Sequence, residues 1–517
     1  MSSYVYVKNP NGRTYVYENT TYWDRETKTC KHKRVSIGHL DPDTNKIVPN
    51  RKKGDAARRR AASVPEKKEK CCVEGIGIAL LLDKIAHQTG VKAVLQNIFR
   101  DDWSRILTCA YYLACEGDAL CHLDTWMERN RAPYSGSMAT QRISELLVRI
   151  TPSLQQEFFR RWISANKQDD YYAMDITSVS SYSDFIEFVR WGYNRDGEAL
   201  PQINLLMLTG EKSRMPVYYR IIPGSIKDVS TLRESIKNLE LFKTGTMHFV
   251  MDKGFYSEKN IDALYDRHMK FLIGVPFTAA FAKNVVGEYR DIIRSHHNYC
   301  MVMDDELYAV TTPMTWDGHR FYVHAYFDSY KAELDSKKFD HLLLCCHDEL
   351  CSGMRVKEHE KYYENYFFIK ETPVRGIKVS YNEDAISEHK RNHVGWFILA
   401  TNDIKDKVRA LEIYRSKDAV EKNFDDLKND LDMKRLRIHS SAAMDGRIFI
   451  QFISLILTTK LKEVMRENGW FKNHTLQEVF EEMKSIREVR IEGKRKNLVT
   501  QLTGFQSEII ELYGLAL

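Results

Sequence analysis

The segment YYAMDITSV (residues 171–179) marks the point where the sequence changes from helical to strand patterning. Before it, apolar residues recur every three or four positions, as they do on one face of a helix. From it onward, short runs rich in β-branched and aromatic residues alternate with turn signals and helical stretches. The pattern predicts the element order β-β-β-α-β-α-β over residues 171–276, with HFVMDKG (248–254) as its fourth strand.

This order predicts how the strands are arranged. Three consecutive strands can form an antiparallel meander, and later strands that are reached through helices then add in parallel. The resulting arrangement is ribonuclease-H-like and puts the end of the first strand beside the end of the fourth. Asp175 and Asp252 lie on these two strands. We therefore expect the two carboxylates to be neighbours.

The remaining sequence predicts further parts around this core, as a length of 517 residues allows about three domains. The predicted fold class is α/β, with the core interrupted by an insertion and flanked by helical regions. The expected parts are a basic N-terminal arm with short strands (1–70), a helical DNA-binding or scaffold domain (71–165), the first part of the core (166–277), a mostly β insertion (278–392), the second part of the core (393–465) and a helical C-terminal region (466–517).

Within these parts several elements can be named. Residues 34–48 read as a hairpin, and FDHLLLCC (339–346) reads as a strand of the insertion. VGWFILATN (394–402) is another strand, which could instead return the chain to the main sheet. Helices are expected over residues 406–430 and 475–490.

Charge is distributed unevenly along the chain. Residues 1–70 carry a net charge of +9, whereas the whole chain carries +6. A basic arm on a near-neutral body is typical of nucleic-acid binding, although a solvated tail gives the same signal. The sequence has no apolar run of about 18 residues and its N-terminus lacks a secretory signal. We therefore expect a cytoplasmic protein.

One cysteine cluster stands out, at Cys345, Cys346, His347 and Cys351. Zinc sites usually have two ligand pairs, and here the second pair is missing. On a strand the neighbouring cysteines would also point to opposite faces. We therefore favour buried thiols over metal binding at this cluster, with reduced cysteines throughout, as is usual in the cytosol.

Phosphodiester cleavage and strand transfer require a particular set of groups. Two divalent cations about 3.5–4 Å apart activate the attacking oxygen and stabilise the leaving oxygen. Mg²⁺ or Mn²⁺ needs oxygen ligands, which converging carboxylates supply. Asp175 and Asp252 could provide two, and Glu421 in the helix 406–430 is the best candidate for the third.

The residues that surround Glu421 in the sequence support its choice as the third ligand. Tyr414, Lys417, Glu421 and Lys428 are separated by steps that keep them near one face of a regular helix, at about 100° per residue. A carboxylate within a basic and aromatic stripe suits a metal ligand flanked by phosphate contacts. Taken alone, the helix could equally be a solvated amphipathic helix with internal ion pairs.

With these residues in view, the sequence resembles bacterial insertion-sequence DDE transposases that carry the YREK signature, Y-x2-R-x3-E-x6-K. The signature matches at Tyr414, Lys417, Glu421 and Lys428, with Lys417 where the family usually has Arg. The resemblance covers about residues 170–465. The other matching segments are DITS (175–178), MDKGFYS (251–257), WGYNRDGEALPQINL (191–205) and GWFILATN (395–402), which look like the two Asp motifs, the hairpin between them and the strand before the Glu helix.

The resemblance implies an enzyme that binds transposon ends and catalyses metal-dependent DNA cleavage and strand transfer. Asp175, Asp252 and Glu421 would hold two Mg²⁺ or Mn²⁺ ions. Tyr414, Lys417 and Lys428 would contact DNA phosphates, although a Lys at 417 lacks the bidentate fork of Arg. The implied partners are the terminal inverted repeats, the target DNA and a second copy of the chain. Two alternatives stay open: a transposase-derived DNA-binding protein without catalysis, and a ribonuclease-H-fold nuclease outside transposition.

Other residues extend the expected DNA path. Lys434, Arg435 and Arg437 follow the Glu helix and would neutralise phosphates in a salt-dependent, sequence-independent way. The basic stretch 487–496 reads rather as solvated surface. Trp126, Trp191 and Trp316 could stack on a flipped base, but a place in the core is the more common role of such residues.

Overall fold

The computed structural model describes residues 2–10, 12–24, 28–42, 44–50, 71–166, 171–183, 185–226, 228–241, 247–372, 376–436, 438, 440–492 and 496–517. The chain divides into two compact units, one of residues 1–71 with 491–494, the other of residues 72–490 with 495–517. No helix within the described ranges is long and apolar enough to cross a membrane.

The smaller unit is an antiparallel sheet with the order β1-β2-β3-β4. Its strands are β1 (Ser2–Lys8), β2 (Thr14–Asp24), β3 (Thr29–Leu40) and β4 (Ile47–Pro49). The pairing of β3 with β4 confirms the hairpin expected over residues 34–48, and Asn45 in its turn has a φ of 52°. The basic runs at 51–53 and 58–60 lie outside the described residues.

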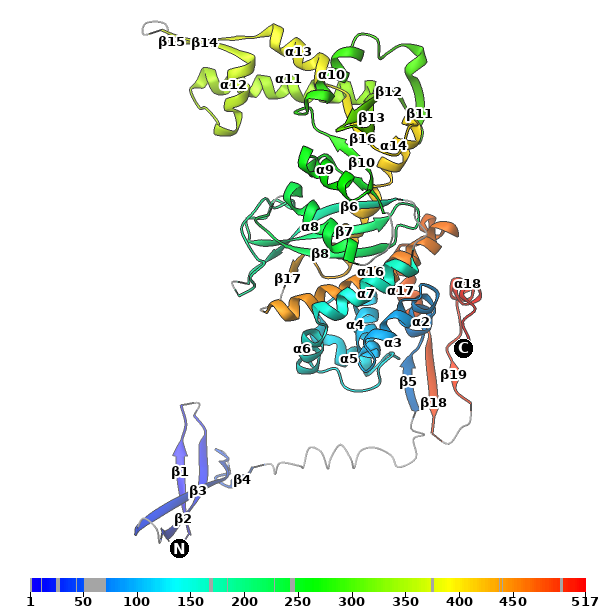
Figure 1. Ribbon diagram of the computed structural model, residues 1–517. Coiled ribbons are helices and arrows are strands. Elements are labelled where there is room, and N and C mark those ends of the chain that lie inside the picture. The colour runs from blue at the N-terminus through cyan, green and yellow to red at the C-terminus, as the bar shows by residue number, and fades with distance from the viewer. Residues whose placement is uncertain are drawn as a thin grey trace. The chain divides into compact units, whose positions relative to one another are not determined.

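A large mixed sheet forms the centre of the second unit (Figure 1). One half has the order β8-β7-β6-β9-β10, in which β6, β7 and β8 are antiparallel while β6, β9 and β10 are parallel. This topology matches the predicted element order and is consistent with a ribonuclease-H-like fold. The elements are β6 (Tyr172–Ser181), β7 (Gln202–Gly210), β8 (Pro216–Pro223), α8 (Asp228–Leu241), β9 (His248–Met251), α9 (Glu258–Asp266) and β10 (Lys270–Val275).

The other half of the sheet continues from β10 with the order β16-β13-β12-β11. β16 pairs antiparallel with both β10 and β13, so the segment 394–402 does return the chain to the main sheet. The strands are β11 (Tyr299–Val302), β12 (Asp305–Trp316), β13 (His319–Phe327) and β16 (Trp396–Thr401). Residues of the expected insertion therefore widen the central sheet.

The same interval also contains long helices, so its expected mostly β character is wrong. FDHLLLCC lies within helix α11 and is not a strand. Its apolar residues recur at Phe339, Leu343, Cys346 and Leu350, a helical spacing that an eight-residue window does not distinguish from a buried strand. The elements are α10 (Ala280–Tyr289), α11 (Ser329–Ser352), α12 (Glu360–Tyr366), β14 (Phe367–Thr372), β15 (Gly376–Tyr381) and α13 (Glu383–His393).

The helices that precede the sheet pack around α16 (Ser441–Glu467), which lies between them and the sheet (Figure 1). Phe449 contacts the rings of Phe99 and Phe158, and Phe452 contacts Phe159 and Tyr219 of β8. A helix from the second half of the chain thus joins the early helices to the sheet. Those helices are α2 (Gly77–Gln88), α3 (Val91–Ile98), α4 (Trp103–Glu116), α5 (Leu123–Met127), α6 (Thr140–Arg149) and α7 (Pro152–Ala165).

The C-terminal region contains strands as well as helices. The expected helix over 475–490 is wrong beyond Lys484, because residues 487–491 form a strand in a small sheet of order β19-β18-β5. Its residues are exposed or half-buried, and the segment lies between β19 and β5 in this sheet. The elements are β5 (Cys71–Gly75), α17 (Leu476–Lys484), β18 (Arg487–Ile491), β19 (Leu498–Val499) and α18 (Gly504–Tyr513).

Phe452 offers a test of this packing. Its side chain is buried between α7 and β8, so Phe452→Ala leaves a cavity and is expected to lower the free energy of unfolding by about 3–5 kcal/mol. Urea unfolding followed by circular dichroism measures the change. Phe471→Ala, at a side chain that is 46% exposed, is the control and is expected to change little. Equal effects of the two substitutions would contradict the placement of α16.

Candidate active site with three carboxylates around Lys417

The pairing of β6 with β9 brings Asp175 and Asp252 together. The two strands are parallel, with Met174 opposite Met251, and each Asp is the next residue of its chain. Burial raises the pKa of Asp175, the charge of Lys417 opposes this effect, and the charge of Asp252 adds a smaller increase. The two carboxylates are therefore neighbours, as the strand order predicted.

The segment that carries Glu421 differs from the single helix expected over residues 406–430. It consists of α14 (Lys407–Arg415), α15 (Asp418–Asp425) and a π-helical turn, η5 (Asp426–Asp430). At the break the backbone N–H of Lys417 donates to the carbonyl of Tyr414, three residues back, and the Ser416 hydroxyl donates to a main-chain carbonyl. Such local hydrogen bonds compete with the regular helical ladder.

Lys417 lies among the three carboxylates. Its Nζ donates to Oε1 of Glu421 at 2.5 Å, and its side chain is 11% exposed, against 55% for Glu421. Burial lowers the pKa of Lys417, but the hydrogen bond to Glu421 and the charges of Asp175 and Asp252 outweigh it, so the pKa is raised. One ammonium group thus balances a cluster of three acidic groups.

Tyr414 fixes the orientation of Asp252. Its hydroxyl donates to Oδ1 of Asp252 at 3.0 Å, and burial, followed by the nearby carboxylate charges, raises its pKa above the ordinary range. The hydroxyl end of the side chain lies against Gly274 of β10, where an added Cβ would be 2.8 Å from the hydroxyl oxygen and 3.0 Å from the backbone nitrogen of Lys253. Only a glycine leaves room for this contact.

A cleft of about 510 Å³ adjoins Asp252 where β10 and β16 meet α14. Tyr414 and Gly274 form one part of its wall, and Phe277 and Lys331 form another. The cleft therefore opens on the Asp252 side of the carboxylate cluster.

The fourth signature residue, Lys428, does not join the carboxylates. Its Nζ donates to both carboxylate oxygens of Asp196 at 2.8 Å, and its side chain is 11% exposed. The π-helical turn explains the difference, because it changes the direction of side chains beyond Asp425. Arg415 donates to the Val302 carbonyl and pairs with Asp305, so it is turned away from the site.

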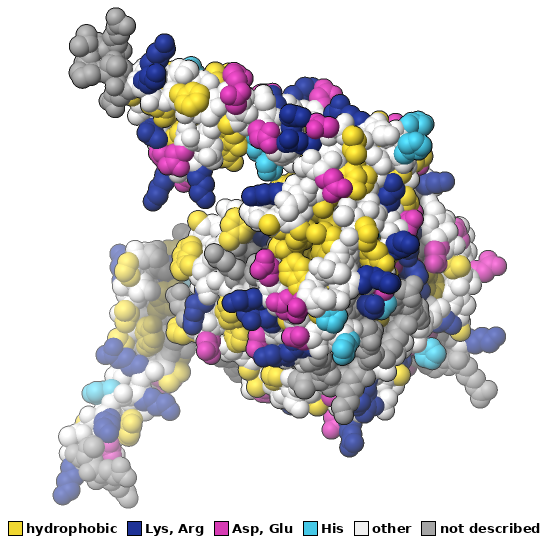
Figure 2. Space-filling view, turned by 45° about the horizontal axis from the view of Figure 1, so that its top comes forward, with side chains coloured by type: hydrophobic (Ala, Val, Ile, Leu, Met, Phe, Trp, Pro, Cys, Tyr) yellow, Lys and Arg dark blue, Asp and Glu magenta, His cyan; other side chains and the backbone are white. Residues whose placement is uncertain are grey.

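The basic residues after the Glu helix return the chain to β6. Arg435 lies in β17 (Arg435–Leu436), which pairs with the end of β6, and its guanidinium binds Glu198 at 2.8 Å above the ring of Tyr182. Lys434 is exposed. Arg437 lies outside the described residues. Over the face drawn in Figure 2, Lys and Arg side chains are interspersed with Asp and Glu, so charge alone does not mark a DNA-binding surface there.

Three aromatic residues between β6 and β7 are exposed, and sequence reasoning identified only one of them. Trp191 is 68% exposed, and Phe185 and Tyr193, which were missed, are 81% and 85% exposed. Trp126 is instead buried, and Trp316 donates to Asp262. The signal for the exposed group was the polar turn sequence NRDG that follows it.

Comparison with known proteins identifies the family of this chain. The family model described as "Transposase DDE domain" matches residues 166–457, more than half of the chain. The chain therefore belongs to the transposase DDE domain family. No curated protein matches the sequence.

Two solved structures are similar at low levels. A piggyBac transposase synaptic complex with hairpin DNA is 11% identical, with a TM-score of 0.35, over 78% of this chain and 70% of that chain. A Drosophila P element transposase strand transfer complex is 12% identical, with a TM-score of 0.13, over 65% of this chain and 82% of that chain. The family membership rests on the domain match.

The donor set fits the divalent ions that this family generally uses. Asp175, Asp252 and Glu421 offer oxygen ligands, which Mg²⁺ and Mn²⁺ prefer. Burial disfavours the ionised form of Asp175, so a cation beside it offsets a real electrostatic cost. Lys417 supplies part of that compensation.

The cost of burying Asp175 can be measured. Because its folded-state pKa is raised above the ordinary value of 3.8, the ionised group costs stability as the pH rises through the folded pKa. In chelating buffer, Asp175→Asn is expected to resist urea better than the wild type at pH 7, and the difference should shrink as the pH falls toward 3.8. A variant that is less stable than the wild type at pH 7 would show that the charge is not buried at a cost.

The close approach at Gly274 gives a second test. Gly274→Ala forces the new methyl group against Tyr414 and the backbone of Lys253, which is expected to cost about 1–3 kcal/mol of unfolding free energy. Gly287→Ala is the matched control, because nothing lies within 4 Å of its Cβ position in α10 and alanine favours a helix. Urea unfolding measures the stability of both variants. If Gly274→Ala is as stable as Gly287→Ala, Tyr414 does not pack against β10.

Proposed function

We propose that the chain is an active DNA transposase in which Asp175, Asp252 and Glu421 hold two Mg²⁺ or Mn²⁺ ions. The observation that carries the proposal is the parallel register of β6 and β9, which makes the two Asp residues neighbours within the family's domain. Glu421 is linked to these residues by the hydrogen bond that it accepts from Lys417. The charges of all three carboxylates act on the Lys417 ammonium.

Bound divalent ions would supply activation of the attacking oxygen and stabilisation of the leaving oxygen. The protein's own residues would orient the ligands. Tyr414 would hold Asp252 through its hydrogen bond, while Gly274 keeps the tyrosine ring close to the sheet. Lys417 would balance the carboxylate charge and lies where it could also contact a phosphate.

We propose that six side chains contact DNA phosphates, three from the signature and three from the basic segment that follows it. Among the described members of this set, Lys434 and Arg435 are exposed and so suited to neutralise phosphates, although Arg435 would first have to exchange its ion pair with Glu198. Lys428 would first have to exchange its ion pair with Asp196 for a phosphate contact. The full set is Tyr414, Lys417, Lys428, Lys434, Arg435 and Arg437.

The same residues support a place in the YREK-signature group of insertion-sequence transposases. Tyr414, Lys417 and Glu421 are close to the carboxylate cluster, with Lys417 at the position of the usual Arg. In this proposal the partners are the terminal inverted repeats, the target DNA and a second copy of the chain on paired ends. The reaction would be cut-and-paste transposition in the bacterial cytoplasm, at the nucleoid when DNA is bound.

The experiment uses duplexes of the inverted repeats that flank the gene. The wild type is expected to cut them in Mg²⁺, and Asp252→Asn or Glu421→Gln should slow cutting by about a thousandfold or more while leaving duplex binding intact. Asp418→Asn is the matched control, because this carboxylate of α15 pairs with Lys422 at the surface. Gel assays of cleavage and binding measure the two activities separately.

Each of the other outcomes would contradict the residue assignment or favour an alternative function. Normal cutting by both variants would show that the carboxylates are wrongly assigned. A wild type that binds the ends but does not cut in Mn²⁺ would favour a DNA-binding protein derived from a transposase. Cutting without preference for the repeats would favour a nuclease outside transposition.

A further inference from the structure

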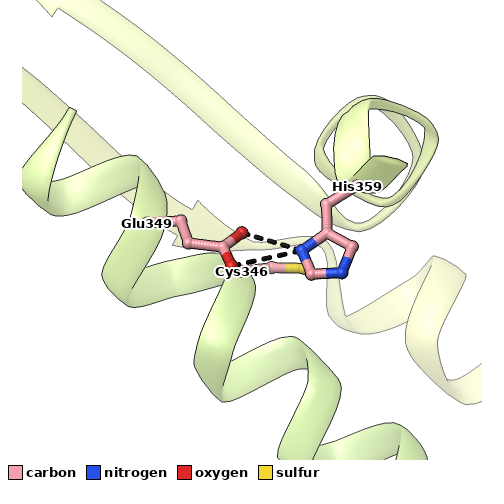
Figure 3. A group of neighbouring side chains, drawn as sticks. All are labelled: Cys346, Glu349 and His359. Carbon is pink, nitrogen blue, oxygen red and sulfur yellow. Dashed lines mark hydrogen bonds and ion pairs between the residues drawn. The ribbon is translucent and has the colours of Figure 1, made fainter. Parts of the chain in front are cut away.

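A second group of metal-ligating side chains lies outside the carboxylate cluster, in the helical part of residues 329–366. The Sγ of Cys346, a carboxylate oxygen of Glu349 and a ring nitrogen of His359 all lie within 4.8 Å of one another. Figure 3 shows Cys346 and Glu349 extending from one helix toward the imidazole. They are three residues apart on α11 and share one face, whereas His359 ends the short turn before α12.

Hydrogen bonds already orient two of the three side chains. Nδ1 of His359 lies 2.9 Å from one Glu349 oxygen and 3.2 Å from the other. The hydroxyl of Tyr363 on α12 donates to Glu349 and accepts a hydrogen bond from the backbone N–H of Val356. Metal sites use such outer hydrogen bonds to fix the direction of their ligands.

The surroundings are apolar on one side and open on the other. Cys346 is fully buried in a core that includes Leu343, Leu350 and Tyr363, and burial raises the pKa of its thiol to about 11. The side chains of Glu349 and His359 are 20% and 26% exposed. An ion could therefore enter from the solvent side and meet the sulfur at the boundary of the core.

We propose that Cys346, Glu349 and His359 bind one Zn²⁺ ion that links α11 to the start of α12. Sulfur, imidazole nitrogen and carboxylate oxygen are the donors that zinc combines, with water as a fourth ligand. Bonds of about 2.0–2.3 Å keep tetrahedral ligand atoms about 3.3–3.8 Å apart, so the three groups need to move by only about 1 Å. Binding releases the Cys346 proton to solvent and replaces the Glu349–His359 hydrogen bond.

The neighbouring cysteines do not converge in this way. Cys345 contacts His341 and Cys351 contacts His347, each one turn along α11 at 3.7–3.8 Å. These pairs lie on more exposed parts of the helix and offer two ligands each. They provide controls, because a metal bound there would depend on a different thiol.

Cobalt titration of the full chain, stripped of metal with a chelator, tests the site. Co²⁺ bound to a thiolate gives a charge-transfer absorption that carboxylate ligands cannot give, so the signal is independent of the proposed catalytic ions. We expect one such Co²⁺ per chain, displaced by Zn²⁺, with the band kept in Cys345→Ala and Cys351→Ala. Cys346→Ala should lose the band.

A second variant guards against a folding defect at the buried cysteine. His359→Gln, at a partly exposed position, should weaken Co²⁺ binding by at least about tenfold, as loss of a ligand or its support does at metal sites. Circular dichroism verifies that both variants are folded. Absence of the band in the wild type, or an unchanged band in Cys346→Ala, would overturn the proposal.

Discussion

The parallel pairing of β6 with β9 is the interaction on which the candidate site depends. It joins a strand of the antiparallel meander to the first strand reached through a helix, with Met174 opposite Met251. A shift of one residue would turn Asp175 to the other face of the sheet. Because both strands are buried, their apolar neighbours fix this register, and the energy of packing holds two acidic groups together.

That proximity has an electrostatic cost, which the segment after β16 reduces. Burial raises the pKa of Asp175, and Lys417 brings a positive charge to it. The break between α14 and α15 lets Tyr414 hydrogen-bond to Asp252 while Lys417 and Glu421 form an ion pair beside it. An interrupted helix therefore brings both a cation and a third carboxylate to the sheet.

The part of the chain between β10 and β16 has two roles in the structure. Its strands β11, β12 and β13 extend the central sheet through β16, and their buried apolar residues join two clusters that also contain residues of β9, β10 and β16. Its helices α11, α12 and α13 instead surround a separate core that includes Phe339, Leu343 and Cys346. Because these helices have a core of their own, the long interval can be accommodated without disturbing the β6–β9 pairing.

The sequence by itself determined the strand order of the core, the neighbouring positions of Asp175 and Asp252, and the family resemblance. These features depend on local periodicity and on general rules of strand connection. The tertiary structure decided the helix at 339–346, the strand at 487–491 and the break at Lys417. Short apolar runs fit a helix or a strand equally well, so long-range packing decides between them. The ion pair of Lys428 with Asp196 and the approach of His359 to Cys346 likewise join residues that no sequence window brings together.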